Sequence, residues 1–394
     1  IRRETLGEKN VKVAQSHNAL AVVYSGTKDI DTALQCYQRA MIALVESFGN
    51  GDLYSNPDTL RSPSDLDLLV SLAGKGDLLR RRYEIRHHLP DLKASLDAFE
   101  RSAELVEKIR RGFGSEGSKI QLGKTSFDVY EQGIRVAHAL YDVTHNDDYI
   151  SAAFSFAERS KAGVLWDAIS ESSARRFAGI PDSLLSRESA LRGDLAYYET
   201  QIQREKEKRN QANISRINSW ESAIFDLRRK YEAIIEVFDK SYPEYHSLKL
   251  DTKVVSLTDV QRDLDTRSAL LEYVVGDSTV SVFVVTKNRC TLESRELHSS
   301  LSTLVRQFRR SIENLDVSAY LDLGSRLYTE LIAPIKTELR GVRKLYIIPD
   351  GILNYLPFEA LLTKQTSPLS SVDFSVLPYL IRDFDIRYNV SARV

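Results

Sequence analysis

Apolar and small residues over residues 1–170 recur at the three- and four-residue steps of paired helices. In residues 14–47 such a set lies on each of two segments: Leu20, Ala21 and Tyr24 on the first, and Ala33, Tyr37 and Ala40 on the second. Small residues let two helices approach closely, and the tyrosines fill the gap between them. Looser versions follow at Leu72, Ala73, Ser95, Phe99 and Ser102, and then at Ala153, Ala157 and Ser160. The pattern predicts three helix pairs, with a Gly/Pro/Ser/Asp-rich loop at residues 49–65 after the first.

Two longer apolar stripes follow the helix pairs. Leucine, isoleucine and aromatic residues repeat at helical steps over residues 184–202 and again over residues 217–238. A polar turn at residues 210–213 separates them. Two stripes of this length on either side of a turn predict an antiparallel helical hairpin. We interpret the mixed-charge run at residues 204–209 as a solvated helix face.

After Pro243 the pattern changes to short β-favouring runs separated by turn residues. The expected strands are residues 269–275, 279–286, 290–297, 345–348 and 383–390, and the expected helices are residues 257–264, 301–313, 320–339 (interrupted at Pro334) and 356–362. Helical segments between the third and fourth strands fit a crossover in a mixed or parallel sheet. The apolar strand 345–348 should lie inside the sheet with both faces buried. Asp350 and Gly351 then turn the chain toward a helix with Pro357 in its first turn.

Composition and charge narrow the possible functions. The chain of 394 residues is 42% hydrophobic and 28% charged, which is ordinary for a globular protein. Its formal net charge of −1 gives no electrostatic case for binding nucleic acid or an acidic membrane surface. No apolar run approaches the roughly 18 residues of a membrane span. With two cysteines there is no disulfide framework, so we expect a reducing, cytoplasmic location.

Several segments resemble the CHAT domain, a caspase-like cysteine protease module found behind tetratricopeptide (TPR) repeats. The most specific is KLYIIPDGILNYLPFEALL at residues 344–362, and residues 256–286 and 325–361 are also similar to that domain. The segment AERSKAGVLWDAI at residues 157–169 resembles the helix that leads into CHAT domains. The first helix pair resembles a single TPR unit.

This resemblance gives the expected fold and domain boundaries. The chain should be multidomain, beginning with an all-α TPR-like superhelix over residues 1–170. A long antiparallel helical hairpin should follow over residues 171–247. The last part, residues 248–394, should be the incomplete N-terminal portion of an α/β caspase-like (CHAT) sheet domain.

The resemblance implies a cysteine endopeptidase in which a histidine activates a cysteine thiolate. Neither residue stands at a matching position, so no catalytic residue is expected in this chain, and the pair is expected beyond Val394. Both chain ends look cut. The expected function is the regulatory and structural N-terminal portion of such a protease, gated by a protein or peptide partner and inactive without the downstream segment. The alternative is a non-enzymatic TPR adaptor with a degenerate CHAT-like scaffold; no cofactor is expected in either case.

Candidate partner contacts lie in the first two helix pairs. Asn18 occupies a position at which such repeats often present an amide to a peptide backbone, and Tyr24 lies on the same helix. A basic cluster in an extra segment between the helices of the second pair could attract an acidic ligand. It comprises Arg80, Arg81, Arg82 and Arg86. The alternatives are a simple surface asparagine and a solvated helix face.

Two carboxylates stand near the end of the strand at residues 345–348. Asp350 follows that strand directly, and Glu359 lies in the expected helix after it. Ligands gather at the carboxyl ends of strands in α/β sheets, so both residues are candidates to line a cleft. The alternative is that Asp350 caps the expected helix and Glu359 complements its dipole.

The remaining reactive residues have plain structural interpretations. Cys36 falls within a helix of the first pair and Cys290 follows a hairpin turn, and neither has a predicted histidine beside it. His87 and His88 are adjacent, and no cysteine or carboxylate completes a metal-binding set, so no metal site is expected. The GKG sequence at residues 74–76 lacks the downstream residues of a phosphate-binding loop, so no nucleotide site is expected.

Overall fold

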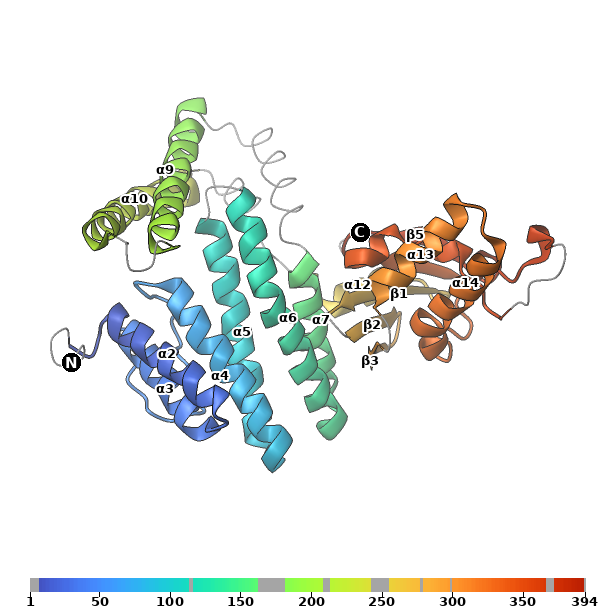
Figure 1. Cartoon of the computed structure of the whole chain (residues 1–394), viewed down its shortest axis with the longest axis horizontal. Coiled ribbons are helices and arrows are strands. Elements are labelled where there is room, and N and C mark those ends of the chain that lie inside the picture. Colours follow the sequence, from blue (N-terminus) through green and yellow to red (C-terminus); the bar gives the residue numbers. More distant parts are fainter. Residues whose placement is uncertain are drawn as a thin grey trace. The chain divides into compact units, whose positions relative to one another are not determined.

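The computed structural model describes residues 7–112, 116–161, 181–207, 213–241, 255–276, 279–297, 300–365 and 372–392 (Figure 1). The chain divides into two compact units. The first comprises Ile1–Val136 with Ala162–Lys253, and the second comprises Ala137–Lys161 with Val254–Val394. None of the described helices combines the length and the apolar character needed to span a lipid bilayer.

Helix pairs form most of the first unit. α2 (Val11–Gly26) contacts α3 (Ile30–Leu44), and α4 (Asp65–Arg86) contacts α5 (Leu89–Gly112). Side chains that accept backbone N–H groups cap the first three of these helices: Asn10, Asp29 and Ser64. The small residues of the first pair are fully buried, namely Ala21, Ala33 and Ala40. The two helices therefore approach closely, as the spacing predicts.

Two glycines of α4 explain the GKG sequence at residues 74–76. A Cβ atom placed on Gly74 would lie 2.3 Å from Cζ of Tyr37, and one on Gly76 would lie 3.0 Å from Cε2 of Phe99. Both distances are shorter than a normal van der Waals contact, so α4 can approach these rings only because it has glycine there. The GKG sequence therefore allows α4 to pack closely against α3 and α5.

The prediction of an extra segment between the two helices of the second pair is wrong. α4 continues as a helix through Arg86 and ends at His87, whose backbone has a left-handed φ of 52°. α5 begins at Leu89, so the connection is a tight turn. The arginines at residues 80–86 therefore lie on a regular helix.

The two helices of the predicted hairpin are present and contact each other. α9 covers Asp182–Glu207 and α10 covers Ile214–Ser241. Apolar side chains of both stripes are buried: Leu191, Leu195, Ile202, Ile217 and Ile234. Tyr231 Oη of α10 also donates to Glu188 Oε1 of α9 at 3.3 Å. Most of the predicted turn, residues 210–212, lies outside the described residues.

Five described strands form a mixed sheet in the second unit. They are β1 (Ser268–Val275), β2 (Thr279–Thr286), β3 (Cys290–Glu296), β4 (Lys344–Ile348) and β5 (Asp385–Tyr388), in the order β3-β2-β1-β4-β5. β1, β2 and β3 pair antiparallel, whereas β4 runs parallel to both β1 and β5. The predicted mixed sheet with a helical crossover is therefore confirmed. β4 is an interior strand, and its residues Leu345, Ile347 and Ile348 are fully buried while Tyr346 is half-buried.

Helices cover both faces of this sheet. Ala269, Leu271 and Tyr273 of β1 join one hydrophobic core with α13 (Leu301–Glu313) and α14 (Val317–Leu331). On the opposite face, Phe154 of α7 packs edge-on against Phe283 of β2, with ring centroids 5.6 Å apart. Side chains alternate between the faces of a strand, so α7 and the α13–α14 pair lie on opposite sides.

α7 has a different place from the one that its sequence pattern indicates. α6 (Glu116–Thr144) and α7 (Asp147–Lys161) correspond to the third predicted helix pair. Ala153 and Ala157 of α7 are fully buried, as expected for the second helix of a pair. However, α7 belongs to the unit that contains the sheet, and its ring contact with β2 is part of the packing there. Residues 162–169 of the same segment lie outside the described residues.

The predicted helix at residues 356–362 is wrong. Two short 3₁₀ turns, Gly351–Tyr355 and Phe358–Ala360, follow β4 instead. Leu356 precedes a proline and is extended, because the proline ring disfavours the helical conformation for the residue before it. The apolar residues of the segment are still buried: Leu353, Leu356, Phe358, Leu361 and Leu362. These side chains reach the core from 3₁₀ turns and irregular backbone. Their spacing along the sequence nevertheless resembles that of a helix.

Candidate functional site

The carboxyl ends of β1, β4 and β5 lie at one edge of the sheet because these strands are parallel. Asp350, which follows β4 after Pro349, accepts a hydrogen bond at Oδ2 from the backbone N–H of Val275, the last residue of β1, at 2.8 Å. The Asp350 side chain makes no capping hydrogen bond to the turn that follows it. The helix-cap interpretation is therefore wrong, and Asp350 joins the ends of two neighbouring strands at the edge where α/β sheets bind ligands.

Glu359 takes part in a second link at this edge. The backbone N–H of Phe358 donates to Tyr388 Oη at 2.9 Å, and that hydroxyl in turn donates to Glu359. Burial, together with the carboxylate of Glu359, raises the pKa of Tyr388. Glu359 is half-buried and belongs to a single 3₁₀ turn, so it has no α-helix dipole to complement. Its hydrogen bond to Tyr388 fixes β5 to the segment after β4.

A buried group of charged side chains lies on the face of the sheet that α7 covers. Lys161 Nζ of α7 is 3.4 Å from Glu272 Oε1 of β1 and 3.4 Å from the carbonyl oxygen of Ile348 at the end of β4. Glu272 is fully buried and Lys161 is 6% exposed. Glu158, also buried on α7, accepts the backbone N–H of Ala392 at 2.9 Å.

Burial raises the pKa of Glu272 to about 8. The Lys161 ammonium opposes this shift, and the neighbouring Glu158 adds to it. Sequence reasoning missed these three residues. The available signal was a glutamate in the middle of the otherwise apolar strand SALLEYVV, because a charge in a buried strand requires a partner.

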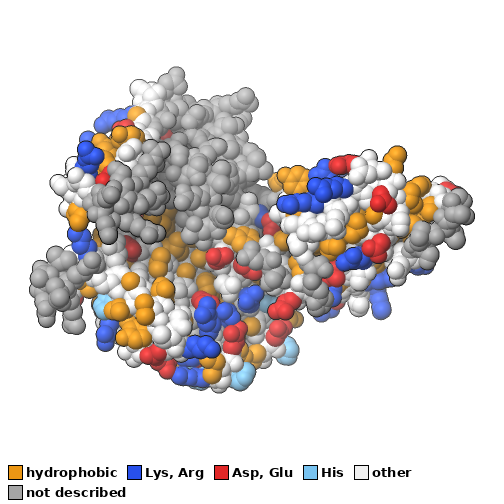
Figure 2. All heavy atoms as spheres, viewed as in Figure 1, with side chains coloured by type: hydrophobic (Ala, Val, Ile, Leu, Met, Phe, Trp, Pro, Cys, Tyr) orange, Lys and Arg blue, Asp and Glu red, His pale blue; other side chains and the backbone are white. Residues whose placement is uncertain are grey.

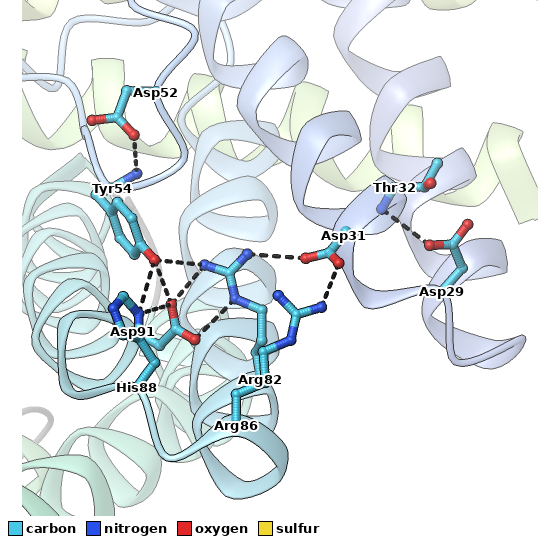
Figure 3. Close-up of polar contacts among 9 residues, drawn as sticks. All are labelled: Asp29, Asp31, Thr32, Asp52, Tyr54, Arg82, Arg86, His88 and Asp91. Atoms are coloured by element: carbon cyan, nitrogen blue, oxygen red, sulfur yellow. Dashed lines mark hydrogen bonds and ion pairs between the residues drawn. The ribbon is translucent and has the colours of Figure 1, made fainter.

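The arginines of the basic cluster on α4 form ion pairs with acidic residues of the same unit (Figure 3). Arg82 is buried and donates from Nε and Nη2 to the two carboxylate oxygens of Asp91 on α5. Its Nη1 lies 3.1 Å from Asp31 on α3, and Asp31 also accepts from Arg86 at 2.6 Å. Tyr54, from the loop after α3, donates to Asp91 at 2.8 Å. The cluster joins two helix pairs and a loop.

The other two arginines are paired along α4. Arg80 contacts Asp77 and Glu84, and Arg81 contacts Asp77 at 2.7 Å. On the face shown in Figure 2, the described Lys and Arg side chains are interspersed with Asp and Glu rather than gathered in one basic area. Arg81 and Arg86 remain about half exposed, whereas Arg82 is 7% exposed. Arg81 and Arg86 are thus the more accessible members of the cluster, whereas Arg82 is enclosed.

Asn18 and Tyr24 contribute to packing between helices. Asn18 is 6% exposed. Its Nδ2 donates to the carbonyl oxygen of Asp67 at 3.0 Å, and its Oδ1 accepts from Ser71 Oγ at 2.8 Å. Both partners lie on α4, so the amide links α2 to α4. Tyr24 is partly buried against the core formed by α2, α3 and α4.

Neither cysteine has the environment of a nucleophile. Burial raises the pKa of Cys36, which is buried on α3. Burial, with smaller contributions from Glu272 and Asp147, raises the pKa of Cys290 to about 12. A nucleophilic cysteine requires the opposite shift, since the thiolate is the reactive form. Both shifts therefore disfavour the reactive thiolate.

The two adjacent histidines are part of the turn between α4 and α5. His87 ends α4, and its ring packs edge-on against Tyr83 with centroids 5.9 Å apart. His88 Nδ1 lies 3.3 Å from Tyr54 Oη and 3.7 Å from Asp91 Oδ1. Among the described residues, no three His, Cys, Asp or Glu side chains come together in an arrangement suited to a metal ion.

A cavity of about 250 Å³ lies beside α14. Its lining combines residues from the end of β3, from α13 and α14, and from the segment after the second 3₁₀ turn: Leu297, Leu304, Ser325, Arg326, Tyr328, Thr329, Glu330, Leu362, Thr363, Lys364 and Gln365. None of the described residues that line it is a histidine or a cysteine.

Comparison with known proteins identifies one part of the chain. The family model of the CHAT domain matches residues 321–394. No curated protein matches the chain. The matched segment starts in α14 and includes β4, the two 3₁₀ turns and β5, so it contains Asp350, Glu359 and Tyr388. Residues 321–394 are thus similar to the CHAT domain, which relates the parallel part of this sheet to a caspase-like, protease-related family.

Proposed function

We propose that this chain is the regulatory and structural N-terminal portion of a TPR-CHAT protein, a caspase-like cysteine endopeptidase. The observation that carries this proposal is the match of residues 321–394 to the CHAT domain, together with the place of these residues in the sheet. They form β4 and β5, whose carboxyl ends meet the end of β1 at one edge. Such edges hold the reactive loops of α/β enzymes.

The chemistry of a cysteine endopeptidase needs a thiolate and a histidine that accepts its proton. Cys36 and Cys290 have raised pKa values, which disfavours the thiolate that a nucleophile requires. In the proposed function the catalytic His and Cys come from further CHAT sequence, and this chain supplies their frame. Asp350 fixes the ends of β1 and β4, and the Tyr388–Glu359 link fixes β5.

The helical first unit is proposed to receive a protein or peptide partner that gates the protease. Paired helices at TPR-like spacing support this part of the proposal, because stacked repeats offer an extended surface. The packing shifts the expected contacts away from Asn18 and Arg82, which are buried, and toward the half-exposed Arg81 and Arg86. The ligand chemistry would be an acidic polypeptide segment.

The test compares residues 1–394 with the natural reading frame extended through a downstream histidine and cysteine. Cleavage is measured on a protein mixture by mass spectrometry of new termini, with and without co-purifying partners. We expect no cleavage by residues 1–394 and cleavage by the extended protein. Replacing Cys36 and Cys290 by serine in the extended protein should leave its cleavage unchanged, whereas loss of cleavage in either variant would contradict the proposal. An extended protein that carries both residues and cleaves nothing would favour the non-enzymatic adaptor.

A further inference from the structure

α7 is tied to the sheet through polar contacts with three different segments. Lys161 reaches Glu272 in the middle of β1 and the carbonyl oxygen of Ile348 at the end of β4, each at 3.4 Å. Glu158, one turn earlier on α7, reaches the backbone N–H of Ala392 beyond the end of β5 at 2.9 Å. Phe154 on the same helix packs against Phe283. One face of α7 thus contacts β1, the end of β4 and the chain after β5.

Burial decides the charge state of Glu272. An ionised carboxylate in a fully buried site is costly. The raised pKa of Glu272, about 8, therefore agrees with a protonated carboxyl group at this position, with Lys161 opposing the shift and Glu158 adding to it.

The hydrogen bond at Ala392 holds the chain just beyond the point where β5 stops pairing with β4. The backbone N–H of Asn389 donates to the carbonyl oxygen of Ile347 at 2.9 Å, immediately after β5. Three residues further on, the N–H of Ala392 is bonded by a side chain of α7. Hydrogen bonds to charged groups are the stronger ones, so Glu158 is a suitable anchor for a segment outside the ladder.

We propose that Glu158, Lys161 and Glu272 form a polar latch by which α7 holds the chain beyond β5 in place. Glu158 is the positioning residue of the latch, and Lys161 joins the same helix to β1 and β4 through Glu272 and the carbonyl oxygen of Ile348. This inference rests on the proposed function for its consequence: the latch would set the position of the segment that leads to the catalytic residues. A displacement of α7 would then release that segment and lower protease activity.

The test measures hydrogen–deuterium exchange by mass spectrometry on residues 1–394. Peptides that cover residues 384–392 report on the latch, and peptides that cover β2 report on the sheet as a whole. Glu158→Ala should accelerate exchange in the first peptides about ten-fold, the loss of one charge-assisted hydrogen bond, and leave β2 unchanged. Glu158→Gln keeps an oxygen that can accept the N–H of Ala392, so it should restore protection. Ser151→Ala, an exposed position of the same helix, is the matched control and should match the native protein.

Three results would overturn the latch: unchanged exchange at residues 384–392 in Glu158→Ala, equal acceleration in β2, or no recovery in Glu158→Gln. None of these readouts requires protease activity, so they remain decisive if the proposed function fails. In an extended protein that does cleave, Glu158→Ala should slow cleavage and Glu158→Gln should recover it. Unchanged cleavage in Glu158→Ala, despite faster exchange, would overturn the link between the latch and the protease.

Discussion

Arg82 and Asp91 form a two-pronged ion pair between α4 and α5. Nε of Arg82 is 3.0 Å from Oδ2 of Asp91, and Nη2 is 2.7 Å from Oδ1. The side chains are 7% and 1% exposed. Burial alone would raise the pKa of Asp91, but hydrogen bonds from Arg82 and Tyr54 outweigh it and hold that pKa below its usual value. The pair is a structural element and not part of a free basic surface.

Arg82→Met should lower the free energy of unfolding of the first unit by about 3 to 5 kcal/mol. The substitution leaves the Asp91 carboxylate buried without its counterion, which costs more than an ion pair itself contributes. Urea unfolding followed by circular dichroism measures the change. The matched variant is Arg81→Met, since Arg81 is half exposed and its pair with Asp77 should contribute less than about 1 kcal/mol. Equal losses in the two variants would contradict the assignment of Arg82 to the buried pair.

Lys75 holds the loop between α3 and α4 through three hydrogen bonds. Its Nζ donates to Gln38 Oε1 at 2.8 Å, Ser55 O at 2.7 Å and Asn56 Oδ1 at 2.9 Å, and the side chain is fully buried. Lys75→Met is similar in length but leaves Gln38 Oε1 and Asn56 Oδ1 without this donor, whereas Ser55 O keeps its hydrogen bond from Gln38 Nε2. At about pH 6, below the lowered pKa of Lys75, we expect a loss of about 2 to 4 kcal/mol in urea unfolding, because each buried unsatisfied oxygen costs about 1 kcal/mol or more. A loss below about 1 kcal/mol would show that water replaces the ammonium.

The pH dependence of Lys75 has a definite sign. Burial lowers its pKa from 10.5 to about 7, against the opposing charges of Asp97 and Asp52. Between these two values the unfolded chain binds a proton that the folded chain lacks, so stability rises with pH by up to about 1.4 kcal/mol per unit. Unfolding of the native protein and of Lys75→Met, compared across this range, should show the rise only in the native protein. Parallel curves for the two proteins would refute the shift.

Glu272 should make the stability of the folded chain fall as the pH rises, in contrast to Lys75. Its pKa is raised from 4.5 to about 8, so the folded chain holds a proton that the unfolded chain releases between these values. The stabilisation is complete below about pH 4.5 and is lost as the pH rises through about 8, with a slope of up to about 1.4 kcal/mol per unit. Glu158 and Lys161 face Glu272 from α7, and Cys290 faces it from β3 with a thiol that stays protonated over this range.

Glu272→Gln is the variant that tests this assignment. An amide resembles the protonated acid and does not ionise, so the fall in stability of the second unit between pH 4.5 and about pH 8 should disappear. Tryptophan is absent from the described sheet unit, so hydrogen exchange of β1 and β4 peptides, corrected for the intrinsic pH effect, is the suitable readout. A variant that keeps the native pH slope would place the titrating group elsewhere.

Much of the second unit could be predicted from local pattern. The strand Thr279–Thr286 and the helix Leu301–Glu313 have the bounds that alternation and helical spacing indicate. The predicted helix at residues 356–362 failed because buried apolar residues in consecutive 3₁₀ turns have a spacing that imitates a helix. Local pattern reports which residues are apolar and not which backbone carries them.

Whether a polar residue is exposed or buried in a hydrogen-bonded pair depends on partners that lie far away in the sequence. Arg82 looked like a surface cation because Asp31, 51 residues earlier, gave no local sign of pairing with it. Asn18 is a candidate ligand contact or a surface asparagine on its sequence position, but it is buried and bonds to Asp67 and Ser71, which the sequence alone does not place beside it. Glu272 carried the clearest local signal, a charge within an apolar strand, but its partners on α7 become evident only in the folded unit.

Gly74→Ala should destabilise the first unit although alanine favours helices over glycine. The added Cβ would lie 2.3 Å from Cζ and 2.5 Å from Oη of Tyr37, so α3 and α4 would have to separate or the ring would have to move. Such overpacking costs about 1 to 3 kcal/mol, which exceeds the helix-propensity gain of about 1 kcal/mol. Gly193→Ala is the matched control, because a Cβ at that position of α9 meets nothing within 4 Å and should stabilise its helix. Combining Gly74→Ala with Tyr37→Leu should recover part of the loss; a neutral Gly74→Ala would mean that α3 and α4 do not approach each other as closely as these distances require.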